Sequence, residues 1–264
     1  RLWESSMREK IALSEKSEAA FYPQCDICIT VGKYLAQDMS ACYHKHFDVI
    51  YSCMSADLRL EDTEPEEGFW KMYGIPEGSR VAIFQGSMTD LRNLDNLARA
   101  TRYLEEDCRL AVVGGGPYEE TFRKILEEEG NPERVVMVGW VNQSDLLKFT
   151  VNADLGVLPY SAMDEYFSYS VPNKLMEYFE ATLPMLYDIS MREISMVAGE
   201  HGVGVGEDLS DPEKFGRTLN SLLHDAEQLS ALKEHYADCK DKFSYESQRK
   251  EFKKILSEHG LLDI

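Results

Sequence analysis

The chain has 264 residues, of which 44% are hydrophobic, and its 28 Lys and Arg against 47 Asp and Glu give a formal charge of −19. This length accommodates one large domain, or one domain with part of another. A negative field of this size repels nucleic acids and anionic lipids, which argues against nucleic acid as a partner. A phosphate-bearing ligand therefore has to be held by a few local cations and by backbone amides.

The termini and the apolar runs give no sign of a membrane protein. No apolar run approaches the roughly 20 residues that span a bilayer. The sequence starts at Arg1, with no initiator Met and no signal peptide, as expected of a piece of a longer chain. We expect a cytoplasmic protein, with peripheral association with the inner membrane face as the alternative.

The cysteines leave one metal site to consider. Six cysteines in a chain of this length are too few for a disulfide scaffold, so we expect reduced thiols. Cys25 and Cys28 form a C-x-x-C pair, and Cys42, His44 and His46 follow, a set that a structural zinc ion can use. We favour the alternative, in which Cys28 lies in a strand and Cys42 to His46 end a helix. No metal ion and no cofactor are expected.

The first sixty residues contain few elements. The expected elements are a helix at 4–20, a strand at 26–31, a helix at 33–43 and a strand at 47–51. The acidic stretch 61–67 follows them and is the best candidate for a linker, which we place at 61–77.

From residue 80 onward, strands and helices alternate. The expected strands are 80–85, 109–113, 134–138, 154–158, 184–187 and 202–205. The expected helices are 91–104, 118–129, 143–150, 173–181, 192–199, 212–224, 226–240 and 245–259. This alternation predicts right-handed β-α-β units and an α/β fold with a doubly wound parallel sheet. Ligands of such sheets bind at the carboxyl ends of the strands, so we expect the site in the loops after Gln85, Val113, Val138 and Leu158.

The first of these loops combines a glycine with a cation. Gly86 and Ser87 follow strand 80–85, and Gly86 lets the backbone approach a ligand closely. Arg92, at the start of the next helix, adds a fixed positive charge that suits an anion. Taken alone, Arg92 is better explained as a solvated surface residue, which is the alternative.

The next two loops are also led by glycines. Gly114, Gly115 and Gly116 form a wall without side chains, which suits a nucleotide. They match neither the dinucleotide-binding fingerprint nor a P-loop, and a purely structural tight turn is the alternative. The third loop contains Val141 and can contact a flat base through its backbone, with a plain tight turn as the alternative.

The fourth loop leads into helix 173–181 and is the most informative. Its proline, Pro172, suits the first position of a helix, and the free amides of Asn173 and Lys174 then point above the sheet, as in phosphate sites. Glu177 shares a face with Lys174 and can accept two hydrogen bonds from a ribose diol. An ordinary surface Lys–Glu pair is the alternative.

The order and spacing of these segments resemble the donor lobe of the GT-B glycosyltransferases. The matching segments are 86–92, 112–117, 138–141, 152–159, 172–178 and 243–246. They are most similar to the retaining, family 4-like group that uses nucleotide-diphosphate sugars, over about residues 78–260. The resemblance implies the end of an acceptor-side lobe at 1–60, a donor-binding domain at 78–242 and a C-terminal helix at 243–264 that returns toward the first lobe.

The resemblance also implies roles for single residues. Arg92 and Lys174 would be catalytic, because they would neutralise the diphosphate as it leaves, without a divalent metal. The donor would be bound further by Glu177 at its ribose and by Val141 at its base. The other residues implied in donor binding are Gly86, Ser87, Gly115, Gly116, Tyr169, Asn173 and Leu175.

Two departures from the family pattern bear on function. Tyr169 occupies the position of the first of two glutamates, which touches the donor sugar in the family. The segment before Arg80 is too short for a complete acceptor-side lobe, so a partner chain or a missing N-terminal lobe would complete the site.

The sequence therefore predicts a retaining glycosyltransferase. Its donor would be a nucleotide-diphosphate sugar, with uridine as the preferred base, and its acceptor a glycan or lipid-linked glycan in bacterial surface polysaccharide or glycoconjugate synthesis. Tyr169 and the short first lobe favour one alternative, a non-catalytic nucleotide-binding or scaffolding module. A nucleotide-sugar epimerase is another alternative, and it would need acid and base residues that the fourth loop does not show.

Overall fold

The structure is a computed structural model that describes residues 2–55 and 64–262. The chain divides into two units, Arg1–Tyr51 with Gln248–Ile264, and Ser52–Ser247. Each unit is built around its own parallel sheet.

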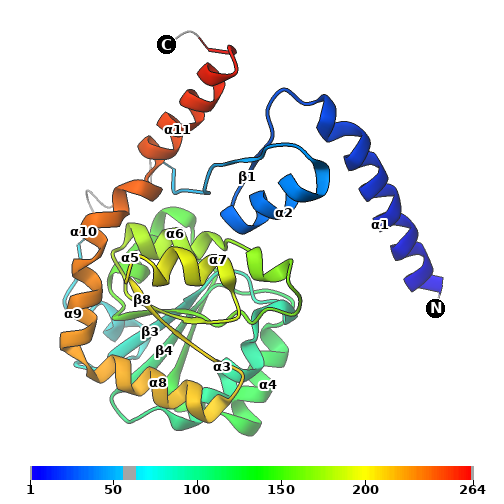
Figure 1. Cartoon of the computed structure of the whole chain (residues 1–264). Helices are drawn as coiled ribbons and strands as arrows, with labels where there is room; N and C mark the ends of the chain where they lie inside the picture. Colours follow the sequence, from blue (N-terminus) through cyan, green and yellow to red (C-terminus); the bar gives the residue numbers. More distant parts are fainter. Residues whose placement is uncertain (1, 56–63, 263–264) are drawn as a thin grey trace. The chain divides into compact units, whose positions relative to one another are not determined.

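The larger unit contains a six-stranded parallel sheet (Figure 1). Its strands are β3 Arg80–Gln85, β4 Cys108–Val113, β5 Val135–Gly139, β6 Leu155–Leu158, β7 Met185–Asp188 and β8 Gly204–Glu207. They lie in the order β5-β4-β3-β6-β7-β8. Because the order reverses between β3 and β6, the topological switch point lies at the carboxyl ends of these two strands. The predicted doubly wound α/β fold is confirmed.

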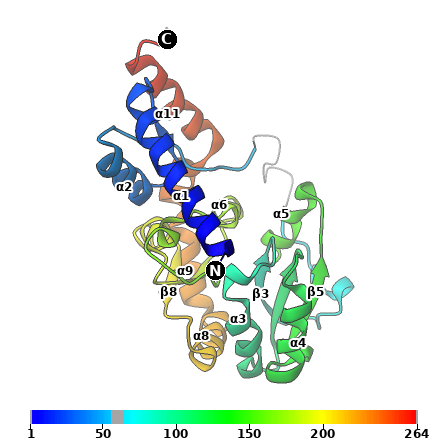
Figure 2. The ribbon, with the colours of Figure 1, turned by 90° about the vertical axis from the view of Figure 1, so that its right-hand side faces the viewer.

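Helices cover both faces of this sheet (Figure 1). They are α3 Leu94–Ala100, α4 Glu119–Glu129, α5 Gln143–Val151, α6 Asn173–Glu180, α7 Arg192–Ile194, α8 Pro212–His224, α9 Ala226–Glu234, α10 Tyr236–Cys239 and the start of α11 Tyr245–Glu258. Ala82 and Phe84 of β3 face the core that is shared with α3, α4 and α8. The intervening Ile83 lies on the other face, where its carbonyl accepts a hydrogen bond from Tyr178 of α6. In Figure 2, α3 and α4 lie side by side.

Three of the predicted helices are divided into shorter elements in the structure. The helix expected at 91–104 is divided into η5 Asp90–Arg92, α3 and η6 Thr101–Tyr103. Asn93 causes the first break, because it is left-handed with φ 52°, a conformation that Asn tolerates, and its side-chain amide donates to the Leu209 carbonyl at 3.3 Å. Arg92 therefore lies before the helix. The helix expected at 192–199 continues from α7 as a π-helical turn, and the one at 226–240 is α9 followed by α10.

The predicted linker at 61–77 differs from the structure over the part that is described. Residues 61–63 lie outside the described residues. Phe69 and Trp70, in η4 Phe69–Tyr73, are buried, and Trp70 Nε1 donates to the Asn152 carbonyl at 2.6 Å. These two aromatic side chains attach the segment to the larger unit, although its neighbours are acidic.

The smaller unit has a two-stranded parallel sheet, β1 Ile29–Thr30 with β2 Asp48–Val49. Its helices are α1 Leu2–Phe21, α2 Lys33–Tyr43 and most of α11, with the short η1 Tyr22–Gln24. Cys28, Ala36 and Phe47 form its buried centre. Both strands are shorter than predicted. The Tyr51 amide donates to Gln248 Oε1 at 2.8 Å, which attaches the C-terminal segment to this unit.

Within residues 2–55 and 64–262, no helix combines the length and the apolarity that crossing a membrane requires.

Candidate functional site

The Lys174 side chain meets the backbone of Gly86 at the switch point. Gly86 follows β3 with φ 104°, and a Cβ at this position would lie 3.6 Å from Nζ of Lys174 on α6. Lys174 therefore reaches across the sheet edge to the end of β3. The left-handed φ is the reason why glycine stands here.

Two cations share one aromatic ring at this point. Lys174 is only 6% exposed, and its Nζ lies 4.0 Å from the ring centroid of Phe84 and 4.9 Å from that of Tyr160. Arg92 Cζ lies 4.6 Å from the same Tyr160 centroid. Among the residues that the structure describes, neither cation has an ion-pair partner, and Arg92 Nε is buried without a hydrogen bond. Such an arrangement of positive charge suits an incoming anion.

The pKa of the Lys174 ammonium lies well below its usual range. Burial is the main cause, because it removes water from the charge, and the Arg92 guanidinium lowers the pKa further. Glu177 acts in the opposite direction. An anion bound between Arg92 and Lys174 would restore the charged form of the lysine.

A chain of buried hydrogen bonds orients the Glu177 carboxylate. Gln85, the last residue of β3, donates from Nε2 to Glu177 Oε2 and accepts from the Thr150 hydroxyl at 2.9 Å. Burial raises the pKa of Glu177, and the hydrogen bond from Gln85 and the nearby Lys174 partly offset this effect. Glu177 is thus a fixed hydrogen-bond acceptor beside the two cations.

Replacing Thr150 with Val should weaken this chain. The change keeps the shape but removes the only donor to Gln85 Oε1 in the described part of the protein, leaving a buried acceptor without a partner. We expect the free energy of unfolding to fall by about 1–3 kcal/mol in urea titrations. Thr218→Val on α8 is the matched control, and an equal effect of both changes would contradict the role of Thr150.

Helix α6 is held close to the sheet by Tyr178. The Tyr178 hydroxyl donates to the Ile83 carbonyl at 3.0 Å, and its ring lies on Gly156 of β6, where a Cβ would meet the ring at 2.6 Å. This packing fixes the start of α6 at the switch point. No described residue accepts a hydrogen bond from the backbone amides of Asn173 and Lys174, as expected for the first turn of a helix.

The triple-glycine loop packs against the loop after β3. A Cβ at Gly114 would lie 2.1 Å from the Gly86 carbonyl oxygen, and a Cβ at Gly116 would lie 2.4 Å from the carbonyl oxygen of Met88. Gly114 and Gly116 therefore permit backbone contact between two loops. Gly115 lies under Trp140, whose Nε1 would be 2.7 Å from its Cβ.

Several predicted residues lie outside the group formed by Gly86, Arg92, Lys174 and Glu177. Leu175 is fully buried in the core, and its amide donates to the Pro172 carbonyl at 2.9 Å. Neither its side chain nor its amide is therefore available to a ligand at the switch point. Ser87 is exposed at its loop, and Val141 is half-buried in the loop after β5.

Tyr169 is buried beside a cation that the sequence analysis did not single out. Arg192 Cζ lies 5.4 Å from the Tyr169 ring centroid, and Arg192 Nη1 donates to the Tyr169 hydroxyl at 3.4 Å. Arg192 also pairs with Glu165 at 3.1 Å.

Sequence reasoning also missed Gln85, Thr150 and Tyr160. A signal was present for Gln85, because it is the one polar side chain at the end of the apolar stretch 81–85. Thr150 lies near the end of α5 and Tyr160 lies just after β6, and no feature of the sequence marks either of them as a site residue.

Comparisons with known proteins identify the family of the chain. The family "Glycosyl transferases group 1" matches residues 69–238. The uncharacterized glycosyltransferase MJ1607 of Methanocaldococcus jannaschii is 26% identical over 146 residues, which make up 52% of this chain and 37% of that relative. The present chain thus spans less than half of this curated relative.

Solved glycosyltransferase structures share the fold. Anabaena Alr3699/HepE in complex with UDP superposes with a TM-score of 0.74 at 15% identity, over 89% of this chain and 64% of that one. WaaG, a glycosyltransferase involved in lipopolysaccharide biosynthesis, superposes with a TM-score of 0.67 at 19% identity, over 86% of this chain and 62% of that one. The fold is that of GT-B glycosyltransferases, and the chain belongs to the glycosyl transferase group 1 family.

Proposed function

We propose that the switch point binds the diphosphate of a nucleotide sugar, and that the chain is the donor-binding part of a retaining, family 4-like glycosyltransferase. The observation that carries this proposal is the convergence of Arg92 and Lys174 on Tyr160 with no carboxylate partner among the described residues. In a chain with a net charge of −19, two such cations favour an anionic ligand at this place above others. HepE has been solved with UDP and with UDP-glucose, which supports a uridine nucleotide as the donor.

Each part of the donor then has a partner. Arg92, Lys174 and the free amides at the start of α6 would hold the diphosphate, Glu177 the ribose hydroxyls, and the Val141 loop the base. In the reaction, an acceptor hydroxyl would bond to the anomeric carbon while the bond from that carbon to the diphosphate oxygen breaks. The diphosphate would leave with the electron pair and take up the acceptor proton, and the two cations would stabilise its charge without a metal ion.

The acceptor is proposed from chemistry and likeness together. A glycan or a lipid-linked glycan supplies the hydroxyl that this reaction needs. WaaG acts in lipopolysaccharide biosynthesis, which supports a role in bacterial surface polysaccharide or glycoconjugate synthesis.

Replacing Glu177 with Ala should remove discrimination between ribose and deoxyribose. The protein should bind UDP about tenfold more tightly than 2′-deoxy-UDP, because the fixed carboxylate accepts from the 2′-hydroxyl. In Glu177→Ala the ratio should fall to about one in calorimetric titrations. Glu180→Ala, at the end of the same helix, should keep the wild-type ratio, and a ratio unchanged in Glu177→Ala would refute the ribose assignment.

Retention has its own test. With an α-linked UDP-sugar and a competent acceptor, we expect the product to keep the α configuration in proton NMR spectra. A β-linked product would refute the retaining mechanism and leave the donor site in place.

A further inference from the structure

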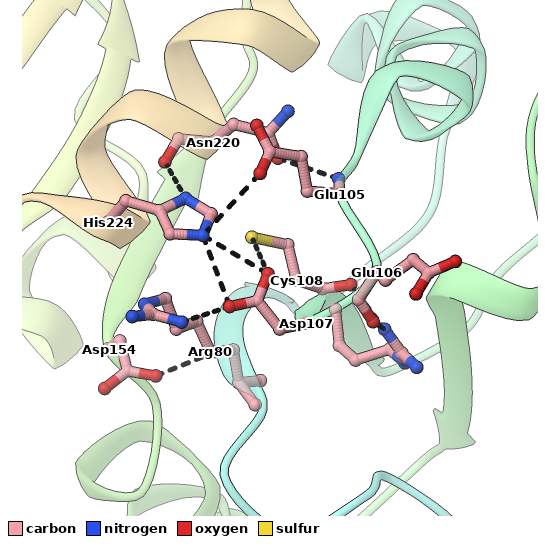
Figure 3. A network of polar contacts seen from close by, with 10 residues as sticks. Arg80, Glu105, Glu106, Asp107, Cys108, Asp154, Asn220 and His224 are labelled. Carbon is pink, nitrogen blue, oxygen red and sulfur yellow. Dashed lines mark hydrogen bonds and ion pairs between the residues drawn. The ribbon is translucent and has the colours of Figure 1, made fainter.

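A second group of polar side chains lies at the opposite edge of the large sheet, at the amino ends of the strands. It consists of Asp107 and Cys108 at the start of β4, His224 at the end of α8 and Glu105 in the loop before β4 (Figure 3). The proposed glycosyl transfer uses none of these residues. Among residues 2–55 and 64–262, Asp107, Cys108 and His224 form the one group of three potential metal ligands, whereas Cys25, Cys28, Cys42, His44 and His46 form no such group.

The separations in this group suit a tetrahedral ion. His224 Nε2 lies 3.2 Å from Asp107 Oδ1 and 3.8 Å from Glu105 Oε2, and Cys108 Sγ lies 3.8 Å from Asp107 Oδ1. The ligand atoms of Asp107, Cys108 and His224 all lie within 4.8 Å of one another. Around a tetrahedral zinc ion with ordinary bond lengths, nitrogen and oxygen ligands are about 3.4 Å apart, and a sulfur ligand lies about 3.6 Å from either. Small side-chain adjustments would therefore complete the coordination.

The imidazole of His224 is already oriented for a cation. Its Nδ1 lies 2.8 Å from the Asn220 carbonyl oxygen, which can only accept, so Nδ1 carries the hydrogen. Nε2 then faces both carboxylate oxygens of Asp107, at 3.2 Å each. A neutral Nε2 and a carboxylate would present only lone pairs to each other, so a proton or a metal ion has to lie between them. A backbone carbonyl on the second nitrogen is the usual support of a metal-bound histidine.

The remaining partners fit the same arrangement. Arg80 binds Asp107 Oδ2, which also faces His224, whereas Oδ1 faces both His224 and Cys108 (Figure 3). The Cys108 side chain is fully buried, and its sulfur faces Asp107 Oδ1. Metal binding would displace the thiol proton to solvent and form the thiolate bond.

We propose that Asp107, Cys108 and His224 form a three-ligand structural site for a divalent cation of the zinc type, with the fourth position open to water or to the exposed Glu105 carboxylate. The mixed nitrogen, sulfur and oxygen donors favour zinc over magnesium or calcium. The ion would join the end of α8 to the start of β4, on the edge of the sheet away from the candidate donor site. Its role would be stability and not glycosyl transfer.

Cobalt and zinc titrations of the whole chain test this proposal. We expect one equivalent of Co²⁺ to give the near-ultraviolet absorption of a thiolate-bound ion, and excess Zn²⁺ to raise the Tm by roughly 5 °C. Cys108→Ala should lose the thiolate absorption. His224→Asn, which keeps a donor for the Asn220 carbonyl, should weaken binding at least tenfold. The matched control is His46→Ala, which should bind Co²⁺ like wild type. His46 also lies beside a carboxylate, 3.1 Å from Asp48, but among the described residues it belongs to no group of three potential metal ligands.

Two results would overturn the proposal. The first is the lack of stoichiometric metal uptake by the wild-type protein, which would leave the group as a surface network around Asp107. The second is thiolate absorption that survives in Cys108→Ala, which would assign the ion to other cysteines, or a Co²⁺ affinity that is unchanged in His224→Asn, which would remove His224 from the site. His224 lies at a helix end and is partly exposed, so His224→Asn keeps the test valid even if Cys108→Ala does not fold.

Discussion

Replacing Lys174 with Met should stabilise the protein and abolish its affinity for a nucleoside diphosphate. The lysine is buried against Phe84 and Tyr160 and has no ion-pair partner among the described residues, so its charge is destabilising in the unliganded protein. Methionine has a similar length and suits an apolar environment. We expect the free energy of unfolding to rise by about 1–4 kcal/mol, the range found when buried charges are replaced by apolar side chains.

The stability difference should depend on pH in a defined direction. The pKa of Lys174 is lower in the folded protein than its unfolded value of about 10.4. Between these two values the unfolded chain binds more protons, so the stability of the wild type rises as pH increases through this window. Lys174→Met lacks this dependence, and in urea titrations the stability gap between the two proteins should narrow as the pH rises toward about 10.4.

A surface lysine serves as the control for this prediction. Lys148 on α5 is exposed and pairs with Asp145 at 3.0 Å, so Lys148→Met should change stability by less than about 0.5 kcal/mol and leave nucleotide affinity unchanged. A Lys174→Met protein that binds UDP as tightly as wild type would remove Lys174 from the site.

Replacing Arg92 with Ala should weaken UDP binding by about 10- to 100-fold, which corresponds to about 1.5–3 kcal/mol for a charge-assisted hydrogen bond. Arg92 Nε is buried and unpaired in the described structure, and Tyr160 holds the guanidinium plane in place. Stability should change little, because no ion pair is lost. Calorimetric titration measures the affinity directly.

Two further variants sharpen this test. Arg92→Lys keeps the charge but loses the planar contact with Tyr160, so its affinity should be intermediate. Arg99 on α3 pairs with Glu129 at 2.8 Å, away from the switch point, and Arg99→Ala should bind UDP like wild type. Equal affinities of Arg92→Ala and Arg99→Ala would contradict the assignment of Arg92.

Much of the fold follows from local sequence patterns. The strand predicted at 80–85 and the helices predicted at 33–43 and 212–224 match the structure because their apolar periodicity and end signals agree. In α8, for example, Asp211 caps the helix by accepting from the Lys214 amide, and Pro212 follows it. The rule that ligands bind at the carboxyl ends of parallel strands selected the loops that contain Gly86, Arg92, Lys174 and Glu177, and the family resemblance implied the roles of the single residues.

The rest depends on contacts between distant segments. Gln85 and Thr150 come into contact because α5 lies next to the end of β3, and no spacing in the sequence specifies that pair. Phe69 and Trp70 lie in a stretch whose acidic neighbours indicated a linker, yet they pack on Phe149. Asp107 and His224 come together over 117 positions, so no metal-binding motif could identify them.

A calorimetric titration of the wild-type chain with UDP, GDP and UMP tests the central claim most directly, because it asks whether the cations at the switch point hold a diphosphate. We expect saturable binding of UDP at one site, at least about tenfold tighter than binding of UMP, since the second phosphate adds contacts with Arg92 and Lys174. Equal affinity for UDP and UMP, or no binding of either diphosphate, would contradict the assignment of these two residues to a donor diphosphate.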